Sequence, residues 1–348
     1  MQAKQDIEFV NIAKTVGIVL VAVGHLTVPV NGLLFINSFH MPLFFILSGY
    51  LLSCSKYNLQ SFAKRKAQTL LIPYLFFAVV SFLFWYFAGQ KLIERESGVN
   101  PVKYLYGILL AIPSKEYLGF NIPIWFLPSL FCTEMIFFIY QKYIKRYTLI
   151  FCVFLFIVGT ILKLYAGCRL PYGLDVGLFT ILFLYSGYLL RKNNQIITYM
   201  QRLKPVLKYA GIIASGLLTY WFALLNGSSG NHVSVYTLQF YNYPVFLCSA
   251  FSGIIFTIML SVSIPSHSLF RFFGRNTIVI LGFHLMCFAI LKGIQVFIFH
   301  ISIETANDAY LLNFIYVLLA FAALAPVIYC INRFAPFLLG RKKTYYNS

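Results

Sequence analysis

A few ionisable side chains stand inside apolar stretches of the sequence, where a membrane should have excluded them. His25, His40, Glu134 and His284 each lie in a hydrophobic run long enough to cross a bilayer. Such a group is costly at that depth unless it is paired or wetted, so each one is a candidate functional residue. An imidazole takes a proton from a hydroxyl near neutral pH, and a nearby carboxylate fixes its tautomer. These residues therefore predict proton transfer at a hydroxyl group inside the membrane.

Each of these side chains also has a structural interpretation. A neutral histidine bonds a backbone carbonyl and holds helices together, as polar side chains do in other bilayer proteins. For His25 the two interpretations have equal weight, whereas packing is favoured for His40 or His284 taken alone. Glu134 fits a structural role less well, because a carboxylate near the middle of a span must be protonated, paired or wet.

Helical rise gives the depth of these residues. At about 1.5 Å per residue, His25 lies roughly 16 Å beyond Lys14, which we take as the cytoplasmic interface. His40 follows the next turn by a similar distance, and Glu134 falls at about the same depth in its own span. The spacing therefore predicts one layer of His25, His40 and Glu134 across three spans.

A basic cluster precedes the third apolar stretch at Lys64, Arg65 and Lys66. Charges in this position are most often topology anchors. They also suit a phosphorylated substrate, because charge-assisted hydrogen bonds to phosphate are strong. Both interpretations stay open on the sequence alone.

The composition identifies the kind of protein that must position these residues. Of 348 residues, 60% are hydrophobic and 10% are charged, which excludes an ordinary water-soluble domain and indicates an integral membrane protein. The formal charge of +18 must then sit in loops facing anionic lipid, which disfavours a nucleic-acid partner.

The fold class expected is an all-α polytopic membrane bundle of about ten transmembrane helices, forming one domain over 1–348 with no separate soluble domain. A hydrocarbon core of about 30 Å needs about 20 helical residues. Ten apolar segments fit, at 9–29, 33–53, 69–89, 124–142, 148–166, 174–190, 206–226, 243–263, 276–299 and 310–332. The stretch 104–112 is too short to cross and is expected at the interface or as a re-entrant segment.

Orientation follows from the distribution of Lys and Arg between loops. With the N-terminus in the cytoplasm, nineteen of the 27 fall on the cytoplasmic side and three lie within or at the ends of spans. The external five are Lys91, Arg95, Lys103, Lys115 and Arg169. Both termini are therefore predicted to be cytoplasmic.

No metal site is expected. The seven cysteines lie mostly in apolar stretches, without a C-x-x-C pair or a histidine cluster at metal spacing, and we interpret them as apolar fillers.

Several short sequence blocks follow one another in a characteristic order along the chain. They are Asn11-Ile12-Ala13-Lys14 leading to Val23-Gly24-His25, Ser38-Phe39-His40-Met41-Pro42 continuing to Ser48-Gly49-Tyr50, Leu71-Ile72-Pro73-Tyr74, Trp125-Phe126-Leu127-Pro128-Ser129-Leu130, and Gly274-Arg275-Asn276-Thr277 before His284. In this order the chain resembles the acyltransferase 3 membrane proteins, and within them the branch similar to fucose 4-O-acetylases. The second block is long and distinctive, whereas 143–270 contributes hydropathy alone.

The resemblance implies transfer of an acyl group, usually acetyl from acetyl-CoA, to a hydroxyl of an envelope glycan or lipid-linked sugar. It implies a multi-pass protein of the cell membrane, with membrane lipid around it and no permanently bound cofactor. It makes His25 the essential catalytic residue, and Arg65 and Lys66 donor-site residues. Asn11 departs from the aspartate that the family often has, which could remove an acidic partner from His25 and place that role on Glu134. Gln68 and Thr69 stand where relatives tend to carry arginine.

The expected mechanism places the CoA phosphates near Lys14, Arg65 and Lys66, with the pantetheine arm reaching towards His25. His25 acts as general base or accepts the acyl group transiently, and Ser48 is a weaker candidate for a covalent carrier. His40, Trp125 and Glu134 are expected to line an acceptor entrance, and His284 is counted with Trp125 and Ser48 among the substrate-binding residues.

The main alternative is an exporter of a glycan or lipid-linked sugar, and a purely structural scaffold ranks last. Carriers show internal repeats with helices interrupted at matching places in the two halves. Pro42 predicts a kink or an interruption in the second span, and we find no counterpart for it in the second half. This favours the enzyme.

Overall fold

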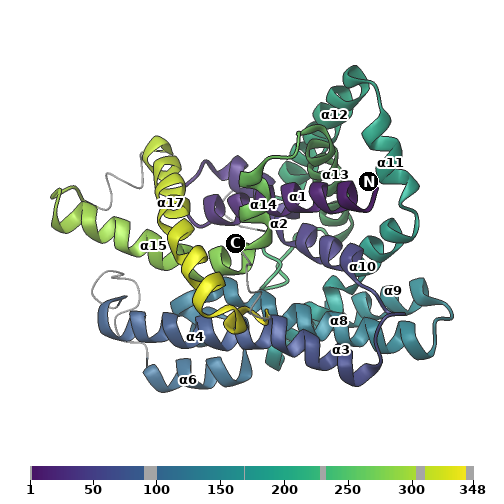
Figure 1. The fold of residues 1–348 in the computed structure, drawn as a ribbon. Coiled ribbons are helices and arrows are strands. Elements are labelled where there is room, and N and C mark those ends of the chain that lie inside the picture. Colours follow the sequence, from purple (N-terminus) through teal and green to yellow (C-terminus); the bar gives the residue numbers. More distant parts are fainter. Residues whose placement is uncertain (1, 90–99, 168, 228–232, 303–309, 342–348) are drawn as a thin grey trace.

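The computed structural model describes residues 2–89, 100–167, 169–227, 233–302 and 310–341, and these form a bundle of helices (Figure 1). Within these residues, nine helices are long and apolar enough to cross a membrane. They are Val30–Leu51, Leu59–Gly89, Lys115–Tyr143, Thr148–Tyr165, Pro171–Lys192, Pro205–Asn226, Tyr243–Ser263, Thr277–Phe297 and Tyr310–Phe334. The chain is thus an all-α polytopic membrane bundle, as the sequence predicts.

Most of the predicted spans agree with observed helices to within a few residues. The observed helices are α2 (Val30–Leu51), α8 (Phe126–Tyr143), α9 (Thr148–Ile161), α10 (Leu174–Lys192), α12 (Pro205–Asn226), α13 (Tyr243–Ser263), α15 (Thr277–Phe297) and α17 (Tyr310–Phe334). Helix α13 matches the prediction at both ends. Its start is fixed because the Asn242 side chain accepts a hydrogen bond from the Val245 amide and a proline occupies the first turn.

The first helix, α1 (Gln2–Gly24), ends earlier than the predicted 9–29. Its last turn tightens, with the His25 amide 3.2 Å from the Ala22 carbonyl and the Leu26 amide 3.0 Å from the Val23 carbonyl. Residues 25–29 then continue without helix to α2. His25 therefore lies just beyond a helix end, where its ring is not restricted to one face of a helix.

The third span begins about ten residues before the predicted boundary and contains two π-helical turns. It runs through α3 (Leu59–Lys66), η1 (Ala67–Leu71), α4 (Ile72–Phe84) and η2 (Trp85–Gly89). Because Pro73 has no N–H, the helix widens ahead of it, and the Ile72 amide bonds the Ala67 carbonyl five residues earlier. The widened turn directly follows Lys66.

The short stretch near 104–112 forms α6 (Pro101–Leu110), which does not cross the membrane. It lies beside α4 (Figure 1), where the Tyr74 hydroxyl donates to the carbonyls of Gly107 at 3.2 Å and Ile108 at 3.0 Å. The α6 backbone at Gly107 also packs directly on the backbone at Tyr117. Only glycine allows this contact, because a Cβ at position 107 would lie 1.8 Å from the Tyr117 carbonyl oxygen. The expectation that this segment does not span is confirmed.

Close backbone packing joins α2 to α10. A Cβ at Gly49 would lie 1.9 Å from the Leu184 carbonyl oxygen, and one at Gly187 would lie 1.9 Å from that of Ile46. Small residues at such a contact are the usual way for helices to associate in lipid, where there is no hydrophobic drive. Helix α1 packs on α2 and also contacts α13, α14 (Ser268–Arg275) and α15.

The interior prolines of α2 and α17 do not break these helices. Helix α2 continues from Val30 to Leu51 across Pro42, and α17 continues from Tyr310 to Phe334 across Pro326. The predicted interruption at Pro42 is therefore absent from α2, and Pro326 is a proline within a second-half span that likewise leaves its helix continuous. In both helices the missing hydrogen bond is tolerated without an interruption.

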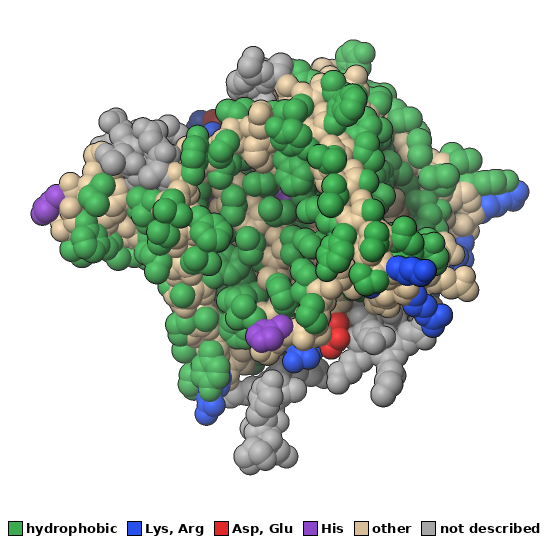
Figure 2. Space-filling view, turned by 90° about the horizontal axis from the view of Figure 1, so that it is seen from above, with side chains coloured by type: hydrophobic (Ala, Val, Ile, Leu, Met, Phe, Trp, Pro, Cys, Tyr) green, Lys and Arg blue, Asp and Glu red, His purple; other side chains and the backbone are tan. Residues whose placement is uncertain are grey.

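The outer surface is that of a membrane protein. Figure 2 shows hydrophobic side chains over the middle of one face and Lys and Arg side chains towards its edges. Many large apolar residues are exposed, including Leu311 and Phe87, both 74% exposed. Lipid rather than water suits such side chains.

Loops predicted on one side of the membrane lie together. The Arg341 guanidinium donates to the Arg275 carbonyl at 2.5 Å, and Gly340 packs on the backbone of Gln68. We call the end holding these residues the basic face. At the opposite end Lys115 and residues 233–239 share a cavity, and we call this the outer face. The predicted loop charges Lys91, Arg95, Lys342 and Lys343 lie outside the described residues.

Candidate active site

A cavity of about 450 Å³ opens at the outer face and contains three of the predicted site residues. His25, His40 and Trp125 line it, from the end of α1, from α2 and from η4 (Gly119–Trp125). The rest of the wall comes from α15 and from the turn formed by residues 233–239. The sequence-based grouping of these three residues therefore corresponds to one cavity.

His25 presents its ring to this cavity. Its side chain is exposed, although the residue lies among packed helices. Its ring centroid is 5.2 Å from that of His284, with the two planes inclined by 49°. Within the described residues His25 has no hydrogen-bonded side-chain partner, so a ring nitrogen is available to a ligand.

His284 and His40 bond backbone carbonyls of their own helices. Nδ1 of His284 lies 2.9 Å from the Ile280 carbonyl oxygen, and Nδ1 of His40 lies 2.8 Å from that of Ile36. A carbonyl only accepts, so Nδ1 carries the proton in each ring and Nε2 is an acceptor. The sequence suggests that such histidines bond backbone carbonyls and thereby hold helices together. Both rings do bond carbonyls, but each carbonyl belongs to the same helix as the histidine.

Glu134 does not belong to the histidine layer. Its Oε1 lies 2.8 Å from the Lys66 Nζ, its side chain is 2% exposed, and its Oε2 has no partner among the described residues. The long Lys66 side chain reaches inward from the end of α3 to this carboxylate. The predicted layer of His25, His40 and Glu134 is therefore wrong as a single group, because Glu134 is held by the basic residues.

A second group of cations gathers at the basic face around this ion pair. Lys14 lies within electrostatic range of Lys66, Glu134 and Arg341. The Arg341 guanidinium donates to the Asn276 and Asn332 side chains, and all its hydrogen-bond partners in the described residues are neutral. Burial lowers the pKa of Arg341 below its ordinary value, and Arg275 adds to the effect.

Arg65 stands apart from this group. It donates to the Tyr57 hydroxyl, and its guanidinium carbon lies 5.2 Å from the centre of that ring. Of the three residues predicted to bind the donor, the structure brings Lys14 and Lys66 together and turns Arg65 outward. Arg341 is a member of this cluster that the sequence analysis did not single out, since a basic residue near a terminus has no distinguishing signal.

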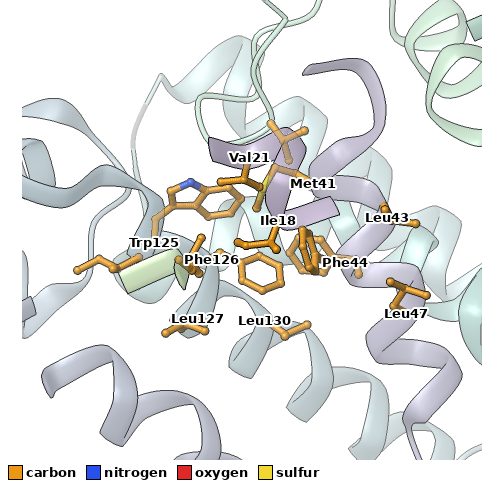
Figure 3. Close-up of a cluster of buried hydrophobic side chains, with 14 of the residues drawn as sticks. Ile18, Val21, Met41, Leu43, Phe44, Leu47, Trp125, Phe126, Leu127 and Leu130 are labelled. Atoms are coloured by element: carbon orange, nitrogen blue, oxygen red, sulfur yellow. The ribbon is translucent and has the colours of Figure 1, made fainter. Parts of the chain in front are cut away.

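An apolar neck lies between the cavity and the cluster. A gap of about 30 Å³ is lined by Ile18, Val21, Met41, Phe44, Phe126, Thr277, Ile278 and Leu281, three of which also line the cavity. Figure 3 shows Ile18, Phe44 and Phe126 converging from three helices. Ile18 is one turn from Lys14, and Thr277 follows the Asn276 that Arg341 binds. The neck therefore shares side chains with the cavity wall on one side and lies one helical turn from Lys14 on the other.

Asn11 cannot be a partner of His25. It lies near the middle of α1, about 20 Å from His25 by helical rise, against Gly274 of α14. An aspartate at this position would be equally distant. The expectation that Asn11 removes an acidic partner from His25, and passes that role to Glu134, is therefore wrong.

Ser48 and Trp125 occupy different environments. Ser48 is half-buried on α2, about 12 Å inward from His40 by helical rise, and does not line the cavity. Trp125 lines the cavity, and its ring lies 6.4 Å from that of Tyr236 with the planes inclined by 36°. Two aromatic faces at a cavity wall suit the apolar face of a sugar ring.

The turn at 233–239 is the main part of the site that sequence analysis missed. Ser234 and Gln239 pair through two backbone hydrogen bonds of 3.0 Å each. Arg169 donates to the Tyr236 carbonyl and forms an ion pair of 2.9 Å with buried Asp175. Burial lowers the pKa of Arg169, while Asp175 opposes this shift. The turn has no sequence signal beyond its polar residues, because its place depends on these distant contacts.

The geometry combines an imidazole in an outer cavity with a basic cluster on the other face and an apolar neck between them. Comparison with curated proteins and with solved structures found no match. The family model for the acyltransferase domain, acyltransferase 3, matches residues 7–333 and so covers nearly all of the described helices. The chain belongs to the acyltransferase 3 family and is a membrane acyltransferase.

Proposed function

We propose that this acyltransferase is an O-acetyltransferase that moves acetyl from cytoplasmic acetyl-CoA to a hydroxyl of a cell-envelope sugar or polysaccharide. The carrying observation is the position of His25, which faces a cavity at the outer face, while the apolar neck lies between that cavity and the basic cluster. The relation to fucose 4-O-acetylases and a place in the cytoplasmic membrane are parts of the same proposal.

The donor side is the basic face. Lys14, Lys66 and Arg341 offer positive charge and N–H donors to the phosphates of CoA, and phosphate is well bound by such groups. Glu134 neutralises part of this charge while the donor is absent. The apolar neck suits the narrow pantetheine arm, which then brings the thioester to His25.

The acceptor side is the outer cavity. Trp125 and Tyr236 offer aromatic faces to a sugar ring, while Asn37 and Gln239 offer amides to its hydroxyls. Among the described residues that line it, Lys115 is the one Lys or Arg side chain and none is a carboxylate. The wall therefore suits a hydroxyl-rich acceptor more than a strongly cationic one.

His25 acts as general base in the transfer. Its free ring nitrogen takes the proton of the acceptor hydroxyl as the oxygen forms a bond to the thioester carbonyl carbon. The carbon–sulfur bond then breaks, CoA leaves as the thiol with the proton from His25, and the acceptor carries the acetyl ester. Direct transfer requires one base and no covalent carrier. Ser48, the other candidate for a carrier, does not line the cavity.

The test compares O-acetyl content of envelope glycans in cells lacking the gene and in cells rescued with wild type, His25→Ala or His267→Asn. His267 is the matched control because its exposed ring only caps α14, and asparagine caps equally well. Mass spectrometry at equal membrane abundance should show acetyl ester restored by wild type and His267→Asn alone. Acetyl ester fully restored by His25→Ala would contradict the general-base role. Unchanged acetylation with glycan retained inside would identify an exporter instead.

A further inference from the structure

We propose that His284 is the positioning residue for His25: its Nε2 accepts an N–H of His25 and so turns the opposite, unprotonated nitrogen of His25 towards the cavity. This inference rests on the proposed function and names a partner for its base. A general base needs an orienting group, since a freely rotating imidazole spends part of its time in an unproductive tautomer.

The first support is the fixed tautomer of His284. Its Nδ1 contacts the carbonyl oxygens of Ile280 at 2.9 Å and Leu281 at 3.0 Å, so Nδ1 must be the donor. Its Nε2 is then left with a lone pair. That nitrogen is buried and has no hydrogen-bond partner among the described residues.

The second support is location. The His284 side chain is fully buried and does not line the cavity, whereas the His25 ring beside it does. The centroid distance of 5.2 Å and inclination of 49° place the rings in contact without stacking face to face. A small rotation of the His25 ring therefore brings an N–H towards the unpartnered nitrogen. A buried acceptor without a partner is costly, and this bond would satisfy it.

The third support is that the described residues offer His25 no competing partner. The other ionisable groups facing His25 are His40, whose Nδ1 is taken by a carbonyl, and Lys115 and Tyr236 on the cavity wall. Glu134 is bound to Lys66, and Asn11 is about 20 Å away by helical rise, near the middle of α1. A neutral imidazole also suits this apolar setting, because it carries a smaller desolvation cost than a buried carboxylate.

During the reaction His25 gains and loses a proton, while His284 keeps the same protonation state. The cavity-facing nitrogen of His25 takes the acceptor proton, and the imidazolium so formed keeps its other N–H on the His284 Nε2. When CoA leaves, the same cavity-facing nitrogen returns the proton to the thiolate sulfur. His284 accepts one hydrogen bond throughout and forms no covalent bond.

The test uses three substitutions of His284 that separate positioning from packing. Glutamine places its amide near the position of Nε2, asparagine places it near Nδ1, and phenylalanine keeps the ring shape with no acceptor. Acetyl transfer from acetyl-CoA to envelope glycan is measured with equal amounts of each variant, together with its melting temperature. Positioning predicts that His284→Gln retains clearly more activity than His284→Asn or His284→Phe, with a loss on the order of 100-fold for phenylalanine.

A packing role predicts the opposite order, because phenylalanine fills an apolar, fully buried site best and should give the most stable and most active variant. That order, or equal activity in all three variants, would overturn the inference. Failure of the proposed function is a separate result, because wild type itself would then transfer no acetyl group. Activity abolished in His25→Ala but unchanged in His284→Phe would retain the function and exclude the positioning role.

Discussion

Lys66 and Glu134 illustrate how a charged pair is tolerated inside an apolar helix bundle. The ammonium and carboxylate lie 2.8 Å apart, and the glutamate side chain is 2% exposed. Each charge alone would face a large desolvation cost, and each is tolerated because the other is present. The pair also holds a lysine of the proposed donor site in a defined place until a phosphate competes for it.

We expect Lys66→Met to destabilise the protein by about 3 kcal/mol, because Glu134 is left buried without a counter-ion. The double variant Lys66→Met with Glu134→Leu should recover most of this loss, since neither charge then remains. Thermal unfolding in detergent measures both effects. The recovered double variant should still bind acetyl-CoA more weakly than wild type, and wild-type affinity in it would exclude Lys66 from the donor site.

At the scale of elements, the position of the site depends on where helices end and how closely they pack. His25 follows the end of α1, and the 233–239 turn is held against the cavity by Arg169. The α2–α10 contact fixes the inner part of α2, which continues to His40 and the cavity. These three features together define the walls around the imidazole.

We expect Gly187→Ala to destabilise the protein by about 1–3 kcal/mol, because the new methyl group would meet the Ile46 carbonyl oxygen at 1.9 Å. Gly32→Ala is the matched control, since nothing lies within 4 Å of a Cβ built there. Melting temperatures of the two purified variants give the comparison. Equal stability of both would show that α2 and α10 separate readily.

Arg169→Gln should loosen the 233–239 turn without unfolding the bundle. The bond to the Tyr236 carbonyl is lost, and pairing it with Asp175→Asn avoids leaving a buried carboxylate alone. Loss of one hydrogen bond of about 1–1.5 kcal/mol should speed amide hydrogen exchange at Ser234 and Gln239 about tenfold. Exchange at α13 is the internal reference. Unchanged exchange in the turn would show that its own two backbone bonds suffice.

For the molecule as a whole, the two faces carry different chemistry. Lys14, Lys66 and Arg341 gather at the basic face, while the histidine cavity opens at the outer face. The sequence predicts the basic face to be cytoplasmic, because most lysines and arginines belong to its loops.

Cysteine labelling tests this orientation in intact cells. A membrane-impermeant maleimide should label Lys103→Cys, at the outer face, without permeabilisation, and Lys64→Cys only after it. Both positions are exposed, so equal reactivity is expected once the membrane is open. The parent chain supplies the background from native cysteines. Labelling of Lys64→Cys in intact cells would reverse the orientation.

Hydropathy and caps were enough to predict most helices, as in α13, where Asn242 and the following proline mark the start. They did not predict the end of α1, because the apolar residues Leu26 and Val28 continue the hydrophobic stretch beyond Gly24. Rise along a helix placed His25 and His40 near one level, but it could not predict that Lys66 would reach Glu134. Side-chain partners between helices depend on rotation about each axis, which a single sequence does not fix.

The apolar neck also has a consequence for the cell's energy supply. A protein that receives one substrate from each side of a membrane risks becoming a pore. Here the gap between Ile18, Phe44 and Phe126 has a volume of only about 30 Å³ and an almost wholly apolar lining, and hydrophobic constrictions exclude water. Without a continuous file of water, protons cannot hop across. If the proposed reaction runs between the two faces, the same three side chains would insulate the proton gradient while it proceeds.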